Sequence, residues 1–137
     1  AYRLEVSALP TMQNDADYYV RQIVARRLPE ALLPSMMSDV QSDVRQEVAQ
    51  RVAMPALLRM AHDEAPEVRR TVAQRLPIGL LGTLANDPDL MVRWEVAQRA
   101  SAPVLTTLLQ DPDEDIRMAA RQRLASVDAP PLGEQHG

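Results

Sequence analysis

A motif that recurs every 24 residues constrains the fold of this chain more than any other feature. The segments VRQEVAQRV, VRRTVAQRL and VRWEVAQRA begin at Val44, Val68 and Val92. Two further columns keep this spacing without an insertion: Ala25, Ala49, Ala73 and Ala97, and Leu9, Leu33, Leu57, Leu81 and Leu105. Constant spacing over most of a chain is expected when similar units stack in the same geometry. We therefore expect one solenoid of about five stacked units.

Each unit is predicted to open with an α-helix of about three turns. Asp87 and Pro88 are typical of an N-cap and of a first helical position. In the helix that follows, Val92 and Val96 are four residues apart and share one face, while Ala97 is small enough for a neighbouring helix to approach closely. The long helix of each unit should therefore bury its valine face.

The second element of each unit is predicted to be a shorter helix. Its apolar residues are three apart, as in Leu81 and Leu84, and this spacing fits either a 3₁₀ helix or a short α-helix. Pro34, directly after Leu33, favours the shorter, irregular form. No segment alternates apolar and polar residues with period two, so we expect an all-α fold without a β-sheet.

The unit, with its pattern V-R-x-x-V-A-x-R-L-P at residues 68–77 and the trailing L-x-x-L-A-x-D-P, resembles the leucine-rich variant repeat, which is similar in style to HEAT-like repeats. The resemblance implies a right-handed solenoid in which α-helices alternate with 3₁₀ helices. It covers residues 1–126, as a partial first unit, four full units and a partial last unit, and leaves residues 127–137 as a flexible tail. Because Arg121 stands where earlier units have alanine, we expect the stack to end there. Ala1 already lies in mid-unit, which suggests a truncated start.

The same resemblance raises a link to iron–sulfur proteins. Some similar proteins carry a cysteine-rich domain that holds an iron–sulfur cluster ahead of their repeats. This chain contains no cysteine, so it offers no thiolate ligand to a cluster and no disulfide. We therefore expect no cofactor in this chain, which would then be the repeat part of an iron–sulfur-associated protein.

Two arginine columns are the most conspicuous chemical feature. Seven residues after the valine, and only about 20° from it on a helix, a structural ladder is predicted, in which arginines bridge to aspartates of adjacent units or to the last carbonyls of helices. Its members are Arg27, Arg51, Arg75 and Arg99, with Asp39, Asp63, Asp87 and Asp111. The arginine directly after the valine lies about 100° from the core face, so this column, which includes Arg21, Arg45 and Arg93, is predicted to be more exposed.

The arginine columns leave nucleic-acid binding open as the alternative function. A ladder of cations with a regular rise could contact successive phosphates. The net charge of −4 and the buried position of the first column oppose this interpretation. We also expect a cytoplasmic protein without a membrane partner, since no apolar run reaches the length of a transmembrane helix.

Signs of catalysis or metal binding are weak. His62 is the single histidine outside the C-terminal segment, and a solvated histidine is the simplest interpretation. Carboxylate pairs such as Asp87 and Asp89 stand where helices begin, and capping explains them without a metal. No nucleophile motif or phosphate-binding glycine loop is present. We therefore expect no enzyme and no metal site.

One apolar cluster breaks the repeat pattern. Trp94, the only tryptophan, stands in a column of mostly polar residues and is predicted to be exposed, because it points about 160° away from the core. Leu90 and Met91 precede it in polar columns, and Met118 follows one unit later. Stacking does not need these residues, so they are candidates for a partner-binding site, although partial burial by neighbours is the simpler alternative. The predicted function is a non-catalytic protein–protein interaction scaffold.

Overall fold

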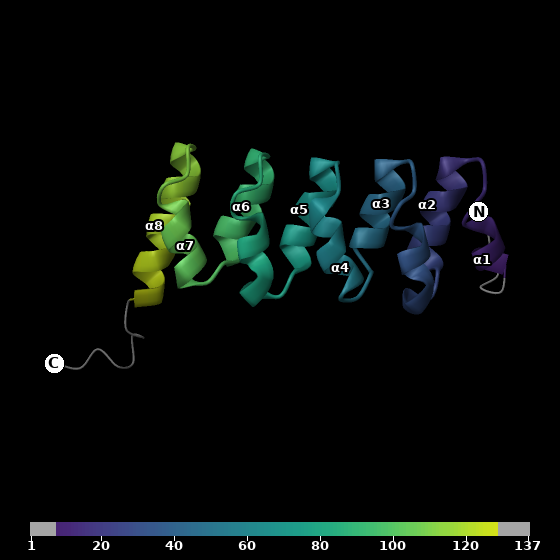
Figure 1. Ribbon diagram of the computed structural model, residues 1–137, viewed down its shortest axis with the longest axis horizontal. Helices are drawn as coiled ribbons and strands as arrows, with labels where there is room; N and C mark the ends of the chain where they lie inside the picture. The colour runs from purple at the N-terminus through teal and green to yellow at the C-terminus, as the bar shows by residue number, and fades with distance from the viewer. Residues whose placement is uncertain (1–7, 129–137) are drawn as a thin grey trace. The chain divides into compact units, whose positions relative to one another are not determined.

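The computed structural model describes residues 8–128, and these contain α-helices and 3₁₀ helices without a strand (Figure 1). This confirms the all-helical prediction. Contacts divide the chain into two compact units, residues 1–75 and residues 76–137. Within each unit the long helices pack beside one another, which is the repeat packing that the 24-residue spacing predicts. The predicted handedness of the stack stays a prediction.

The first unit alternates long and short helices. Its long helices are α2 (Tyr18–Arg27), α3 (Ser42–Ala49) and α5 (Pro66–Arg75). Its short elements are α1 (Leu9–Met12), η2 (Glu30–Met36), α4 (Ala56–Arg59) and η3 (Met60–His62). Neighbouring long helices pack together, α2 against α3 and α3 against α5.

The second unit keeps the same order of elements. It contains η4 (Ile78–Leu84), α6 (Leu90–Arg99), α7 (Ala102–Leu108) and α8 (Glu114–Asp128). The long helices α6 and α8 pack against each other, and α7 packs against α8. Helix α8 includes residues 127 and 128, which were expected to belong to the tail; the rest of the predicted tail lies outside the described residues.

The short elements adopt both of the predicted conformations. The 3₁₀ form occurs in η2, which accommodates Pro34, and in η4. The α form occurs in α7, while α4 continues into the 3₁₀ turn η3. An apolar pair three residues apart packs inward from either form, so the spacing alone did not distinguish them.

The helix start was predicted two residues too early. Asp87 is not the N-cap of α6; its Oδ1 accepts a hydrogen bond from the N–H of Asp89 at 2.9 Å, which closes a local turn. Asp89 is the N-cap, and its Oδ1 accepts from the N–H groups of Met91 and Val92. Asp111 and Asp113 repeat this division, since Asp111 orders the loop and Asp113 accepts from the N–H of Ile116.

The predicted apolar columns form the core of both units. Val44, Val48 and Ala49 are fully buried in the first unit, as are Val92 and Val96 in the second. The leucines of the short elements join them, and so do two methionines of the same columns: Leu33, Met36, Leu57, Met60, Leu81 and Leu105. Burial of apolar side chains is the main source of stability. Each repeat contributes its own set of these buried residues.

Candidate functional site

The arginine that follows the core valine is a buried structural clamp. The guanidinium group of Arg45 donates from Nε to Oδ2 of Asp63 at 2.8 Å and from Nη2 to Oδ1 of Asp63 at 3.1 Å. Its Nη1 donates to the carbonyl oxygen of Asp39 at 2.7 Å. Since Asp39 and Asp63 lie in successive loops, one side chain ties two repeats together.

The same clamp occurs elsewhere in both units. Arg21 binds Asp39 in the first unit, and Arg93 binds Asp111 in the second, each at 2.8 Å from Nε to Oδ2. The hydrogen bond with Asp39 raises the pKa of Arg21 above its ordinary value, and Asp63 does the same for the pKa of Arg45. Arg21 and Arg45 therefore keep their charge, and all three guanidinium groups are directed at aspartates of the protein.

This column was predicted to be more exposed, and that prediction is wrong for Arg21 and Arg45, which are buried. Arg93 is half-buried. The helix geometry was correct, but a helix inside a stack is covered on both flanks as well as on its core face. A position about 100° from the core direction therefore points at a neighbouring repeat rather than at solvent.

The other arginine column binds helix ends rather than aspartates. Arg75 donates from Nη1 to the carbonyl oxygens of Ala49 at 2.8 Å and Val52 at 2.7 Å. Arg51 donates to Ala25, and Arg123 of α8 donates to Ala97 and Ala100. These acceptors lie at the C-terminal ends of α2, α3 and α6, where carbonyls lack partners within the helix.

Of the two kinds of partner predicted for the ladder arginines, Arg51 and Arg75 bind the last carbonyls of helices. The alternative pairing with aspartates does not occur at Arg51 and Arg75, because Asp39 and Asp63 accept from Arg21 and Arg45 instead. Asp87 binds the N–H of Asp89, and Asp111 binds Arg93. Of the two remaining members of the column, Arg27 is exposed and Arg99 is half-buried.

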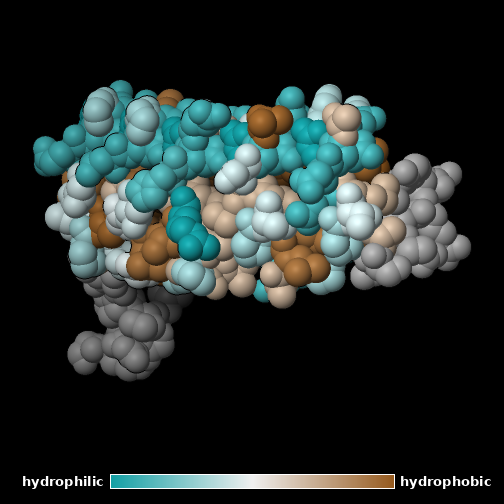
Figure 2. Space-filling view, turned by 45° about the vertical axis from the view of Figure 1, so that its right-hand side comes forward, coloured by the Kyte–Doolittle hydropathy of each residue, from teal (hydrophilic) through white to brown (hydrophobic). Residues whose placement is uncertain are grey.

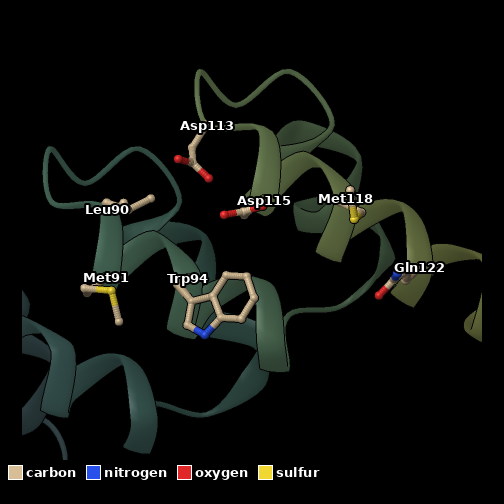
Figure 3. A pocket seen from close by; sticks show the side chains of 7 residues that line it. All are labelled: Leu90, Met91, Trp94, Asp113, Asp115, Met118 and Gln122. Atoms are coloured by element: carbon tan, nitrogen blue, oxygen red, sulfur yellow. The ribbon is translucent and has the colours of Figure 1, made fainter.

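The apolar cluster predicted around Trp94 lines a pocket in the second unit (Figure 3). Leu90, Met91 and Trp94 come from α6, and Met118 comes from α8. The pocket has a volume of about 310 Å³. Figure 3 shows the indole ring of Trp94 extending from α6 toward α8. The structure therefore brings all four predicted partner-binding residues together.

Trp94 itself is half-buried, so the prediction of an exposed side chain is wrong. Leu90 and Met118, by contrast, are each 43% exposed, and Met91 is 41% exposed. The indole projects away from the core as expected, but it is large enough to lie against the adjacent repeat. A tryptophan held in this way presents part of its ring to the pocket.

Three polar residues complete the pocket, and the sequence analysis did not identify them as site residues. Asp113 precedes α8, and Asp115 and Gln122 lie on α8. Figure 3 shows the Asp113 and Asp115 carboxylates above the indole, near the start of α8. The signal was available, because these residues follow Leu90 and Trp94 by about one repeat and successive long helices pack side by side.

A second pocket, of about 380 Å³, occupies the corresponding columns of the first unit, where Tyr18, Tyr19 and Gln22 stand 72 residues before Leu90, Met91 and Trp94. The tyrosine rings stack with centroids 5.2 Å apart. Arg26 and Asp43 also line this pocket. Sequence analysis missed the two tyrosines, although adjacent aromatics are notable in a chain with 3% aromatic residues.

The surface of the molecule carries both hydrophilic and hydrophobic areas. Figure 2 shows hydrophilic side chains gathered along the upper edge of the visible face, with hydrophobic residues in separate patches below. Within residues 8–128, no group of histidine, cysteine or carboxylate side chains could hold a metal ion. None of the helices in this part of the chain is long and apolar enough to cross a membrane.

Comparison with known proteins agrees with the repeat geometry. Residues 66–89 match the family described as leucine rich repeat variant. A solved structure described as a leucine-rich repeat variant with a novel repetitive protein structural motif is 33% identical, with a TM-score of 0.57, and the match covers 95% of this chain and 68% of that one.

A solved engineered protein is 17% identical over 94% of this chain and 64% of its own, with a TM-score of 0.36, which is too low to add to the assignment. No curated protein matches the sequence. The identity and coverage of the first match, together with the clamped 24-residue units, lead to one conclusion: this chain belongs to the leucine-rich repeat variant family and is a helical-repeat protein.

Proposed function

We propose that this chain is a non-catalytic scaffold that binds a protein partner at the pocket between α6 and α8. The observation that carries this proposal is the exposed apolar cluster of Leu90, Met91 and Met118 around a half-buried Trp94. Other repeats hold polar residues in most of these columns and stack equally well. Apolar side chains that packing does not require are typical of interaction sites, and tryptophan is enriched at their centres.

The arginine contacts support a protein partner over a nucleic acid. Arg21, Arg45 and Arg93 direct their guanidinium groups at aspartates and loop carbonyls, and Arg51 and Arg75 direct theirs at helix ends. Donors used in this way are not available to phosphates without breaking internal hydrogen bonds. Nucleic-acid binding predicts retention on immobilised DNA that falls steeply with salt, whereas the scaffold proposal predicts no retention at moderate salt.

Selection of peptide binders from a random displayed library against the immobilised chain tests the proposal. The affinities of the enriched peptides would then be measured by calorimetry for the wild type and for the double variant Leu90→Ser with Trp94→Gln. We expect the variant to bind at least about tenfold more weakly, because hot-spot truncations commonly have effects of this size.

A matched control removes two exposed apolar residues elsewhere, through Val40→Ser with Ile78→Ser. This control should leave the affinities unchanged. Peptides that bind the pocket variant as tightly as the wild type would show that the contact lies elsewhere and would contradict the proposal.

The association with an iron–sulfur protein stays a prediction from family resemblance. Its test is the coding sequence upstream of Ala1, where cysteines at cluster spacing would support the link.

A further inference from the structure

We infer that the pocket between α6 and α8 binds a cationic side chain, arginine or lysine, presented by the partner segment; this rests on the function proposed above. The pocket combines two kinds of surface that a long cationic side chain needs. Leu90, Met91, Trp94 and Met118 give it an apolar part, and Asp113 and Asp115 add two carboxylates. Arginine and lysine have an apolar stem and a charged end, and therefore match both surfaces at once.

The apolar residues of the pocket would contact the apolar stem of the cationic side chain, and Trp94 would also attract its charge. Leu90 of α6 and Met118 of α8 both line the pocket, and each leaves apolar area open to solvent. The indole of Trp94 lies between the two helices, and tryptophan is the aromatic ring that attracts a cation most strongly. A methylene chain over Trp94 would cover the apolar area that the repeat leaves exposed.

The carboxylates of Asp113 and Asp115 would bind the charged end of that side chain. Asp113 uses Oδ1 to cap α8 through the N–H of Ile116 at 3.1 Å, and Asp115 accepts no hydrogen bond from the described residues. No basic side chain is among the described residues that line the pocket. The nearby Arg93 and Arg117 donate instead to Asp111 and to loop carbonyls. Among residues 8–128, no ion pair to either of these carboxylates is found.

The corresponding pocket of the first unit contains both a carboxylate and a basic side chain. There Asp43 occupies the column of Asp115, but Arg26 lines the same pocket. Arg26 also forms an ion pair with Glu47 at 2.8 Å. In the second unit the column of Arg26 holds Gln98 and that of Glu47 holds Ala119, so this ion pair is missing and no basic side chain occupies these columns beside Asp115. A partner side chain would supply the cation.

The test uses the indole N–H of Trp94, which is the single indole signal of the full chain in a ¹⁵N correlation spectrum. The chain would be titrated with a short glycine–serine peptide that carries one arginine between two leucines. The comparison peptide replaces arginine with citrulline, which has nearly the same shape but no charge. We expect the arginine peptide to bind at least about fivefold more tightly at low salt, as two partly exposed ion pairs would give.

The variant Asp113→Asn with Asp115→Asn should abolish the preference for arginine, and asparagine at residue 113 keeps the N-cap. The control Asp17→Asn with Glu30→Gln removes the same charge far from this pocket in sequence and should preserve the preference. Unchanged thermal unfolding midpoints would show that both variants fold.

Equal binding of the two peptides would overturn the inference. If Leu90→Ser then weakened both peptides, the proposed scaffold function would stand without the cation. No response of Trp94 to either peptide would also overturn the inference, and the displayed library would still judge the function separately. A Trp94 signal that shifts with protein concentration as the sedimentation coefficient rises would mean that a second copy of the chain occupies the pocket, which likewise overturns it.

Discussion

Arg45 and Asp63 join successive repeats through two parallel hydrogen bonds, and both side chains are only 8% exposed. The planar guanidinium group donates to both carboxylate oxygens while a third nitrogen reaches the carbonyl of Asp39. A lysine ammonium group cannot reproduce this planar set of donors. The clamp therefore gives a structural reason for arginine in this column of a chain that contains no lysine.

We predict strong energetic coupling between Arg45 and Asp63. Replacing Arg45 with methionine leaves a buried carboxylate without its cation and should lower the free energy of unfolding by about 3–5 kcal/mol. In a double-mutant cycle with Asp63→Asn, measured by urea unfolding, the coupling should reach at least about 1 kcal/mol. The more exposed pair Arg26 and Glu47 is the control, with an expected coupling of about 0.2–1 kcal/mol. Additive effects at Arg45 and Asp63 would contradict direct pairing.

The clamp should not weaken at moderately alkaline pH. Its hydrogen bond with Asp63 raises the pKa of Arg45 in the folded state, so the protonated form is favoured by folding. The stability from such a group is fully present below its unfolded pKa, which for arginine lies far above pH 10, and is lost only as the pH rises through the folded pKa. The coupling free energy measured at pH 7 and pH 10 should therefore be equal. In Arg45→Lys the coupling should also persist at pH 10 but should be lost at a lower pH than in the wild type, since the ordinary lysine pKa is only about 10.4.

Arg75 should stabilise the end of α3. Its Nη1 donates to the carbonyls of Ala49 and Val52, which methionine at residue 75 would leave to solvent or without partners. We expect Arg75→Met to reduce the free energy of unfolding by about 1–3 kcal/mol, as for a hydrogen bond to a charged group. The substitution Arg59→Met, at an exposed arginine on α4, should change it by less than about 0.5 kcal/mol. Equal effects would argue against a role in capping.

Leu81 should be among the most sensitive core positions of the second unit. It is fully buried in η4, and truncation to alanine leaves a cavity that the packed repeat cannot readily fill. We expect Leu81→Ala to lower the free energy of unfolding by about 2–5 kcal/mol. Ile78→Ala, in the same element but 51% exposed, should have a clearly smaller effect. Chemical denaturation of both variants makes the comparison, and similar losses would contradict the predicted burial.

Trp94 should respond to its pocket neighbours. Because the indole is half-buried against α8, acrylamide should quench its fluorescence less than that of free tryptophan. The variant Leu90→Ser with Met118→Gln should increase quenching, with only a small change in stability, since both residues are partly exposed. The equivalent change in the first unit, Tyr18→Ser with Gln46→Ala, is the control and should leave quenching as it was. Unchanged quenching in the pocket variant would contradict the observed packing.

The sequence by itself determined the helical repeat and its core. Stacked copies need the same residue at the same place, so the valine, alanine and leucine columns could be identified without coordinates, and Val92, Ala97 and Leu81 are buried as predicted. The cluster of Leu90, Met91, Trp94 and Met118 could be recognised in the same way, because it departs from that periodicity.

Tertiary structure decided which polar groups meet. Angles on a single helix placed Arg45 toward solvent, but the adjacent repeat covers that flank and brings Asp63 to it. Asp113 and Asp115 likewise join Trp94 only because α6 and α8 pack side by side. Helical periodicity describes directions around one axis, whereas these contacts depend on the distance and register between two axes, which packing of the whole unit sets.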